Sequence, residues 1–319
     1  MTWFDVFNGD ADGICSLHQW RTAHPAEAEL VTGVKRNINL LGRLKVSPGG
    51  TATVFDISFD SNRDDALRLL AGGMTVEWFD HHFAGEPVVH PLFRSHIDTA
   101  PDTCSSLIVD GALNGMCGAW AVVGAFGDNL HGPARALGER YGFDRGRIEA
   151  FAELGELLNY NGYGDSVGDL HFDPAQLYRE IRAYRDPAAF IANSPAFTKL
   201  QSGFRDDLAK SESLTPLLVE EDAAAWRLPD APWARRVVGV MANRLAAAYT
   251  ERAHALIVPN SSGTHTVSVR APKARPTGAD ELCLRFPTGG GRKAAAGINQ
   301  LPESSLETFL NEFFAQFTR

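Results

Sequence analysis

The sequence predicts an α/β protein that begins with a doubly wound parallel sheet. Residues 3–7, 51–57 and 74–79 are short runs rich in branched and aromatic side chains, which is typical of buried strands. Residues 14–22 and 61–71 have helical patterns and lie between those runs. Because strands that alternate with helices usually form a parallel sheet covered on both faces, this order predicts the doubly wound arrangement.

Capping signals and weaker patterns complete this first part of the chain. Ser61 is placed to cap the second helix, and Gly72 with Gly73 is a typical C-terminal stop. The pattern of residues 30–34 predicts a weaker strand. The pattern of residues 103–126 predicts an apolar helical stretch.

The chain is expected to divide into three segments. Residues 1–130 form the N-terminal domain with the parallel sheet. Residues 131–230 predict a helical middle section, with helical patches at 147–158 and 174–184. Residues 231–319 then predict a smaller α/β domain.

The C-terminal domain is predicted from one helix, two strands and a final helix. Residues 234–252 have one apolar helical face, and strands are expected at 255–258 and 265–270. Ser304 and Glu307 have the spacing of a capping box at the start of the final helix. The apolar face of that helix contains Leu306, Phe309, Leu310, Phe313 and Phe317.

Composition limits the class of protein and of partner. The chain has 319 residues, 44% of them hydrophobic, and a formal net charge of −9, so we expect no binding to long nucleic-acid duplexes. The four cysteines form no CxxC pair. The N-terminal residues lack the pattern of a signal peptide, and no apolar run is long enough to span a bilayer. We therefore expect a cytoplasmic protein without a membrane partner.

Acidic and imidazole side chains follow the ends of three predicted strands. They are Asp10 and Asp12 after the first strand, Asp56 at the end of the second, and Asp80, His81 and His82 after the third. A further acid, Asp128, follows the apolar segment AWAVVGAFG. Because the carboxyl ends of parallel strands line one crevice, these side chains are expected to converge there.

Several carboxylates in one crevice need cations to offset their repulsion. Mixed carboxylate and imidazole donors favour Mn²⁺, and Mg²⁺, Co²⁺ and Zn²⁺ remain alternatives. A bridging carboxylate can hold two ions about 3.5–4 Å apart, an arrangement that activates water and binds a phosphoryl oxygen. Each motif alone has a plainer explanation, because DxDG also forms ordinary turns and Asp12 also caps helices. Their common position at strand ends favours a metal centre.

The order of these motifs resembles the DHH phosphoesterase family. The matching features are DxDG, a strand-terminal aspartate, Asp-His-His and the aspartate of a GxxGD-type segment. The C-terminal part resembles the companion DHHA1 domain, through TGGGRKAAAG at residues 288–297 and the strand VSVR at 267–270. The resemblance covers residues 1–130 and 231–319 and is strongest to the RecJ-like exonuclease, oligoribonuclease and cyclic-dinucleotide phosphodiesterase branch.

This resemblance implies a role for each site residue. Asp10 is expected to bind one metal and Asp12 the other, with Asp56 bridging both. His81 and Asp128 would complete the second metal's ligands. The resemblance places His82 at the scissile phosphate as a catalytic residue, and Asp80 behind the histidines as the group that orients them.

Two positions depart from the pattern of the family. Many relatives have a metal-ligating histidine shortly before DxD, whereas this chain has Asn8 in that region and no histidine. Asn8 or a water is expected to fill that place. Arg292 stands where the family usually has a histidine after the triple glycine, and its guanidinium still suits phosphate.

The C-terminal domain is expected to bind the substrate. Strand alternation places Ser268 and Arg270 on one face, which could contact a ligand. Gly289, Gly290 and Gly291 would let backbone N–H groups approach an anion, with Arg292 adding positive charge. Residues 294–297 are expected to allow close helix packing. A flexible glycine turn beside an ordinary edge strand is the alternative interpretation.

These expectations combine into a functional hypothesis. We expect a hydrolase that uses two Mn²⁺ ions, with Mg²⁺ or Co²⁺ as alternatives, to cleave phosphoester bonds in short nucleotides or oligonucleotides. A bisphosphonucleoside or polyphosphate phosphatase is a second hypothesis. A nucleotide-binding regulator that keeps the fold without catalysis is a third.

Overall fold

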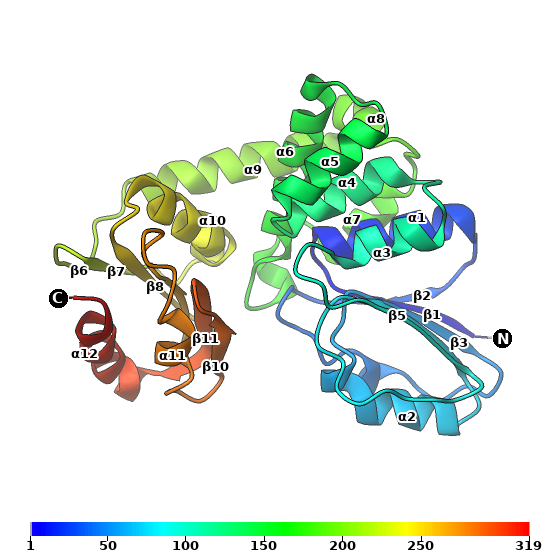
Figure 1. Ribbon diagram of the computed structural model, residues 1–319, viewed down its shortest axis with the longest axis horizontal. Coiled ribbons are helices and arrows are strands. Elements are labelled where there is room, and N and C mark those ends of the chain that lie inside the picture. Colours follow the sequence, from blue (N-terminus) through cyan, green and yellow to red (C-terminus); the bar gives the residue numbers. More distant parts are fainter. Residues whose placement is uncertain (1, 319) are drawn as a thin grey trace. The chain divides into compact units, whose positions relative to one another are not determined.

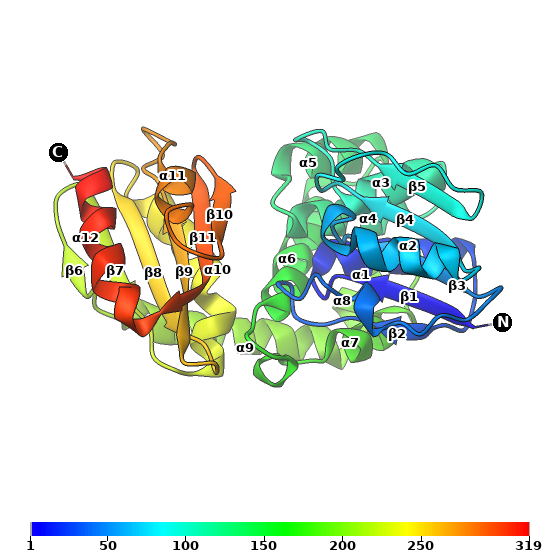
Figure 2. The same cartoon turned by 90° about the horizontal axis from the view of Figure 1, so that it is seen from below.

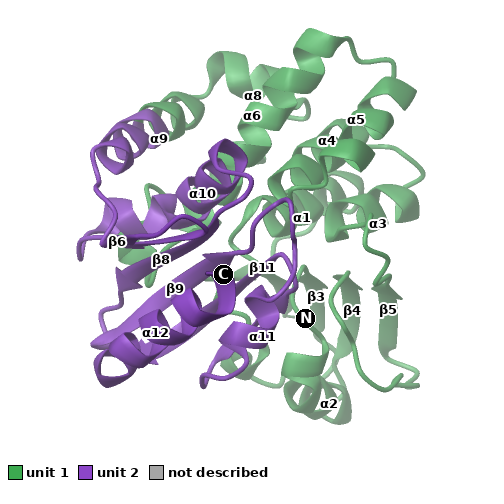
Figure 3. Ribbon diagram, turned by 60° about the vertical axis from the view of Figure 1, so that its left-hand side comes forward, with its two compact units in different colours: residues 1–202 green, residues 203–319 purple. Residues whose placement is uncertain are grey.

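The computed structural model describes residues 2–318 as two compact units. Unit 1 contains residues 1–202 and unit 2 contains residues 203–319, as coloured in Figure 3. Helix α9 (Pro195–Glu212) spans the boundary between them. The expected middle section at 131–230 is therefore divided, with most of its helices in unit 1.

Unit 1 contains a five-stranded parallel sheet, as the sequence predicts. The strands are β1 (Trp3–Phe7), β2 (Glu29–Val31), β3 (Thr51–Phe55), β4 (Thr75–Asp80) and β5 (Phe93–Ile97). Their spatial order is β2-β1-β3-β4-β5, and every neighbouring pair is parallel. The chain runs to one side of β1 and then to the other, so the order reverses between β1 and β3.

Helices cover both faces of this sheet (Figure 1). Helix α2 (Arg63–Ala71) lies on one face, and Leu69 and Leu70 pack there against Val54 and Trp78. The other face carries α1 (Ala11–Ala23) and α3 (Ser105–Ala112), and α4 (Gly118–Gly127) packs on these two helices. The remaining helices of this unit are α5 (His131–Arg140), α6 (Arg145–Gly162), α7 (Pro174–Ile181) and α8 (Pro187–Asn193). The doubly wound prediction is confirmed.

Some details of unit 1 differ from the prediction. Ser61 does not cap α2, because a 3₁₀ turn (Asp60–Asn62) precedes the helix and Asn62 occupies the cap position. The stop after α2 is as expected, with Gly72 as the cap and Gly73 at φ 78°. The apolar stretch at 103–126 is helical as expected, and it forms two helices because residues between α3 and α4 turn through Asn114 at φ 51°.

Unit 2 contains a smaller mixed sheet of six strands in the order β10-β11-β9-β8-β7-β6. The strands are β6 (Leu218–Val219), β7 (Ala223–Arg227), β8 (Ala253–Pro259), β9 (Thr264–Arg270), β10 (Gly289–Arg292) and β11 (Ala295–Pro302). Helix α10 (Pro232–Ala248) packs on one face. Helices α11 (Ala279–Cys283) and α12 (Leu306–Phe317) pack on the other, and Figure 2 shows α12 lying along that face.

Residues 295–297 begin strand β11, and helix α11 packs against that strand, in line with the expected close helix packing. Gly289–Arg292 and Ala295–Pro302 form an antiparallel hairpin, and β11 also pairs with β9. The final helix is confirmed, although a 3₁₀ turn (Glu303–Ser305) replaces the expected capping box.

Among residues 2–318, no helix is both long enough and apolar enough to cross a lipid bilayer.

Candidate metal centre

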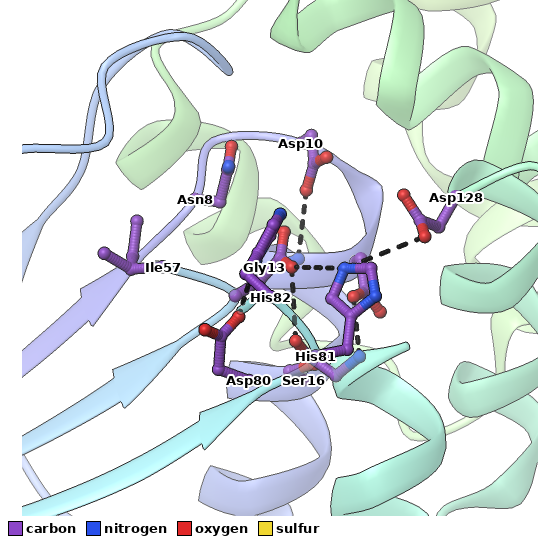
Figure 4. Close-up of polar contacts among 12 residues, drawn as sticks. Asn8, Asp10, Gly13, Ser16, Ile57, Asp80, His81, His82 and Asp128 are labelled. Carbon is purple, nitrogen blue, oxygen red and sulfur yellow. Dashed lines mark hydrogen bonds and ion pairs between the residues drawn. The ribbon is translucent and has the colours of Figure 1, made fainter. Parts of the chain in front are cut away.

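The acids and histidines of the sequence motifs lie together at the carboxyl edge of the parallel sheet of unit 1. Asp10 and Asp12 follow β1, Asp56 follows β3, and His81 follows β4. The edge between β1 and β3 is where the strand order reverses, which is the usual place for ligands in an open α/β sheet. Figure 4 shows several of these side chains directed into one space.

Asp10 is held by a helix end and by a lysine. Its Oδ1 accepts a hydrogen bond of 3.1 Å from the backbone N–H of Gly13, so Asp10 caps α1. Its Oδ2 lies 2.6 Å from Nζ of Lys35. Burial tends to raise the pKa of Asp10, but the charge of Lys35 and these hydrogen bonds outweigh it and lower the pKa below its usual value.

Asp12 is bound by the start of another helix. Its two carboxylate oxygens accept hydrogen bonds of 2.8 Å each from the backbone N–H groups of Ser105 and Ser106. Asp12 therefore caps α3, and so anchors α3 to the start of α1. Each oxygen keeps a further lone pair, so this capping role leaves Asp12 able to serve as a metal ligand.

Asp56 lies at the centre of the cluster. Its φ of 56° is in the left-handed region, which is uncommon for residues other than glycine. Its Oδ1 lies 3.3 Å from Nε2 of His81 and 3.2 Å from Oγ of Ser105. The carboxyl groups of Asp10 and Asp56 are close enough for each to influence the pKa of the other. Oδ2 of Asp128 lies 3.8 Å from the same nitrogen of His81.

His82 is oriented by a buried acid. Its Nδ1 lies 2.7 Å from Oδ1 of Asp80, whose side chain has no exposed surface. Burial lowers the pKa of His82, but the hydrogen bond and charge of Asp80 outweigh this and raise it above its usual value. Because Nδ1 of His82 is paired with Asp80, Nε2 is available to contact a ligand in the crevice.

Crowding of like charges shifts the pKa values of two further carboxyl groups. Burial, followed by the charges of Asp10 and Asp12, raises the pKa of Asp56 well above its usual value. Burial and the charge of Asp12 also raise the pKa of Asp128, to about 6. The cluster therefore takes up protons when no other cation offsets its charge.

The donor set fits a divalent metal ion. Asp56, His81 and His82 offer ligand atoms that all lie within 4.8 Å of one another. Ligand bonds of about 2.1 Å place neighbouring ligand atoms roughly 3–3.5 Å apart, which matches the 3.3 Å between His81 and Asp56. A cation would also stabilise the ionised forms of Asp56 and Asp128. Asn8 offers one more oxygen, because its Oδ1 is buried without a hydrogen-bond partner among residues 2–318.

Three residues of the cluster were not predicted from the sequence: Lys35, Ser105 and Asn159. Lys35 follows β2, and its Nζ also donates to Oδ1 of Asn159 at 2.8 Å. A signal for Lys35 was present, because a basic residue follows the weak strand beside β1. Ser105 and Asn159 carry no comparable signal, since each is an ordinary polar residue in a helix.

The residues proposed to bind substrate lie on the sheet of unit 2. Ser268 is 8% exposed, and its Oγ accepts a hydrogen bond of 3.0 Å from Arg270. Arg270 also donates to Oδ1 of Asn243 in α10 at 3.0 Å. Helix α10 packs on that side of the sheet, and substrate binding by Ser268 and Arg270 stays a prediction.

The three glycines allow close backbone approach within unit 2. A side chain on Gly289 would lie 1.8 Å from the carbonyl oxygen of Cys283, and one on Gly291 would lie 2.5 Å from Cα of Ala296. Gly290 has no neighbour within 4 Å of such a position, and Arg292 is exposed. Packing thus accounts for Gly289 and Gly291, and anion binding by this run stays a prediction.

Comparison with solved structures shows which fold this is. A RecJ exonuclease bound to manganese superposes with a TM-score of 0.66 and 20% identity, covering 98% of this chain and 89% of that one. RecJ of Thermus thermophilus in complex with Mn²⁺ gives 0.58 and 19%, covering 98% and 51%. The pGpG-specific phosphodiesterase PggH of Vibrio cholerae gives 0.56 and 12%, covering 99% and 98%.

The sequence itself matches no protein-family model. It also matches none of the curated proteins. The structural likeness extends over almost the whole chain, which includes both segments that carry the DHH and DHHA1 resemblance. The chain therefore has the fold of the RecJ exonucleases and of the PggH phosphodiesterase, and the fold expected from that resemblance is confirmed.

Proposed function

We propose that this protein is a metal-dependent phosphoesterase that acts on short nucleotides or oligonucleotides. The observation that carries the proposal is the convergence of Asp56, His81 and His82, beside Asp10 and Asp128, at the carboxyl edge of the sheet. The fold supports it, because one solved structure with this fold is an exonuclease with manganese and another is a pGpG-specific phosphodiesterase.

The cluster would hold Mn²⁺, with Mg²⁺ or Co²⁺ as alternatives, through Asp56, His81 and Asp128, with Asp10 and Asp12 at its other side. When bound, a divalent ion at such a site supplies a Lewis acid that activates water and neutralises phosphoryl charge. Asp56 is the central ligand, because it contacts His81 and lies close to Asp10.

The protein's own groups position the reaction. Asp80 holds Nδ1 of His82, so the other ring nitrogen points to the space shared with Asp56 and His81. There His82 would donate a hydrogen bond to a phosphoryl oxygen or assist the leaving group. Ser105 donates to Asp56 and so fixes the rotamer of the central carboxylate.

Unit 2 would supply the substrate-binding role. Arg270 is held in place by Ser268 and Asn243, and Arg292 is exposed on the neighbouring hairpin. Guanidinium groups suit phosphate because their donors match its oxygens. The net charge of −9 favours a short substrate that needs only local cations, over a long duplex that needs a basic surface.

The decisive experiment is a hydrolysis panel with purified protein. Short RNA and DNA oligomers, linear and cyclic dinucleotides, 3′-phosphoadenosine 5′-phosphate and polyphosphate are each tested with Mn²⁺, with Mg²⁺ and with chelator. We expect Mn²⁺-dependent cleavage of the short nucleotides. Binding without turnover across the panel would instead identify a nucleotide-binding regulator, and preference for polyphosphate would favour a phosphatase.

Matched variants test the site within the same panel. Asp56→Asn is expected to abolish both Mn²⁺ binding and turnover, whereas Asp64→Asn, on an exposed aspartate of α2, should change neither. Arg270→Ala and Arg292→Ala are expected to raise KM more than they lower kcat, with exposed Arg275→Ala as the control. Unchanged KM in both arginine variants would remove unit 2 from substrate binding.

A further inference from the structure

Lys35 is anchored at three places in the candidate metal centre. Its backbone N–H donates to the carbonyl oxygen of Gly162 at 2.8 Å, and its own carbonyl accepts from Nδ2 of Asn8 at 3.3 Å. Its side chain then reaches Asp10, with Nζ 2.6 Å from Oδ2. Because both the backbone and the ammonium are fixed, the charge of Lys35 is directed at the cluster.

The ammonium has defined partners on different elements. Besides Asp10 at the start of α1, Nζ donates to Oδ1 of Asn159 in α6 at 2.8 Å. It also lies 5.6 Å from the ring centroid of Tyr163, within the range of a cation–π contact. An ammonium has three donors, so two are used by Asp10 and Asn159 and one remains for a ligand.

The two sides of the cluster therefore differ. On one side, Asp56 and Asp128 face the imidazole of His81, which is itself a metal donor. On the other side, a carboxylate oxygen of Asp10 already has a full positive charge at hydrogen-bond distance. A pair of metal ions about 3.5–4 Å apart would place one ion at Asp10, against the ammonium of Lys35.

We propose that Lys35 takes the place of one metal ion, so that this centre holds a single divalent cation, at Asp56, His81 and Asp128. This inference rests on the proposed function and gives the centre one ion, where the family resemblance implies two. The third N–H of Lys35 then serves the phosphoryl group of the substrate, which a second metal ion would otherwise bind.

Removal of Lys35 should open the second position. Oδ2 of Asp10 would lose its counter-charge, and Oδ1 of Asn8 is buried without a partner among residues 2–318. Carboxylate and amide oxygens suit Mn²⁺, and the carboxyl group of Asp56 lies close enough to Asp10 to influence its pKa. The structure thus predicts that the variant gains an ion.

The experiment compares the full chain with three variants. Lys35→Met removes the charge and keeps most of the side-chain length, Lys35→Arg keeps the charge, and Lys45→Met makes the same change at an exposed lysine. Mn²⁺ per chain is measured by equilibrium dialysis with elemental analysis. Electron paramagnetic resonance distinguishes an isolated Mn²⁺, with its six-line spectrum, from an exchange-coupled pair. Circular dichroism checks that each variant is folded.

We expect one uncoupled Mn²⁺ per chain in the wild type, Lys35→Arg and Lys45→Met, and two coupled ions in Lys35→Met. Two coupled ions in the wild type would overturn the inference, and would leave the proposed function intact if that protein hydrolyses the panel substrates. One ion in a folded Lys35→Met would also overturn it. If Lys35→Met does not fold, the wild-type spectrum alone decides, and a wild type without bound Mn²⁺ would refute both proposals.

Discussion

Nδ1 of His82 lies 2.7 Å from Oδ1 of Asp80, and the two side chains differ completely in exposure. The side chain of Asp80 is 0% exposed, whereas that of His82 is 44% exposed. A buried acid at the end of β4 thus holds an exposed imidazole at the edge of the candidate metal centre. If His82 serves the proposed reaction, this contact predicts that Asp80 is a positioning residue acting through His82.

Asp80→Asn should therefore impair catalysis without removing the metal. The amide keeps the shape of the carboxylate but loses its charge, so His82 is held less firmly. We expect kcat to fall roughly 10–100-fold, with Mn²⁺ per chain unchanged. His82→Ala should lower kcat at least as far, and Asp80→Asn added to it should have little further effect. Loss of Mn²⁺ in either variant would show that these residues serve the ligands instead.

A second buried pair supports β1, the strand that leads to Asp10. Nη2 of Arg21 lies 2.5 Å from Oδ1 of Asp5 and Nε lies 2.8 Å from Oδ2, so the contact is bidentate. Both side chains are less than a tenth exposed. Burial raises the pKa of Asp5 above its usual value even though Arg21 opposes this effect. Asp5 and Arg21 therefore form a buried ion pair that is largely shielded from water.

Arg21→Met should destabilise the fold strongly. It leaves the carboxylate of Asp5 buried without its partner, and a broken buried pair typically costs about 3–5 kcal/mol. The double variant Asp5→Leu with Arg21→Met removes both charges and should recover much of that loss. Urea unfolding at neutral pH gives the free energy of unfolding of wild type, Arg21→Met, Asp5→Leu and the double variant. Equal free energies of unfolding for Arg21→Met and wild type would contradict this account.

The strands of unit 1 could be predicted where their side chains are apolar on both faces. Val54 and Trp78 belong to such strands and are fully buried. The last strand, Phe93–Ile97, was missed because its sequence FRSHI is mostly polar and only partly buried. The hairpin of Gly289–Arg292 with Ala295–Pro302 was missed for another reason. Its small residues reflect close backbone approach, which depends on neighbours far away in the sequence.

The same distinction applies to the candidate site. Asp10, Asp56 and His81 could be placed together from the sequence, because the carboxyl ends of parallel strands share one edge. Lys35 could not be assigned to Asp10, since a long side chain after a weak strand can point in many directions. Its orientation is decided by Gly162 and Asn8, which hold its backbone and are not neighbours in the sequence.

Gly127 should be essential for the geometry around Asp10 and Asp128. A side chain on Gly127 would lie 2.2 Å from Cβ of Ala11 and 3.0 Å from the carbonyl oxygen of Gly155. Gly127→Ala therefore forces α1, α4 and α6 apart, at a cost of about 1–3 kcal/mol.

The separation should also weaken Mn²⁺ binding, because Ala11 lies next to Asp10 and Gly127 next to Asp128. Thermal unfolding and Mn²⁺ titration of Gly127→Ala measure the two effects. Gly132→Ala in α5 is the control, since no atom lies within 4 Å of the added carbon and alanine favours the helix. A Gly127→Ala protein with wild-type stability would show that these helices can separate without cost.

His18 offers a test of pH dependence away from the metal cluster. Its side chain is 3% exposed, and its ring packs edge-on against Trp120 with the centroids 4.8 Å apart. Nε2 has no hydrogen-bond partner among residues 2–318. Burial lowers the pKa of His18 to about 4, and a hydrogen bond with the backbone of Tyr184 opposes this only in part.

The sign of the effect follows from the two pKa values. The pKa of His18 in the folded protein, about 4, lies below the 6.5 of an unperturbed histidine, so between these values the unfolded chain binds the extra proton. Stability from neutral His18 is present above pH 6.5 and declines as the pH falls toward 4, by about 3 kcal/mol in total.

A comparison of wild type with His18→Phe tests this. The unfolding free energy of the wild type minus that of His18→Phe should fall by that amount between pH 7 and pH 4. Taking the difference between the two proteins cancels the contribution of the carboxyl groups to the pH dependence, because their raised pKa values act in the opposite direction in both proteins. A constant difference for His18→Phe would mean that His18 is not held neutral by burial.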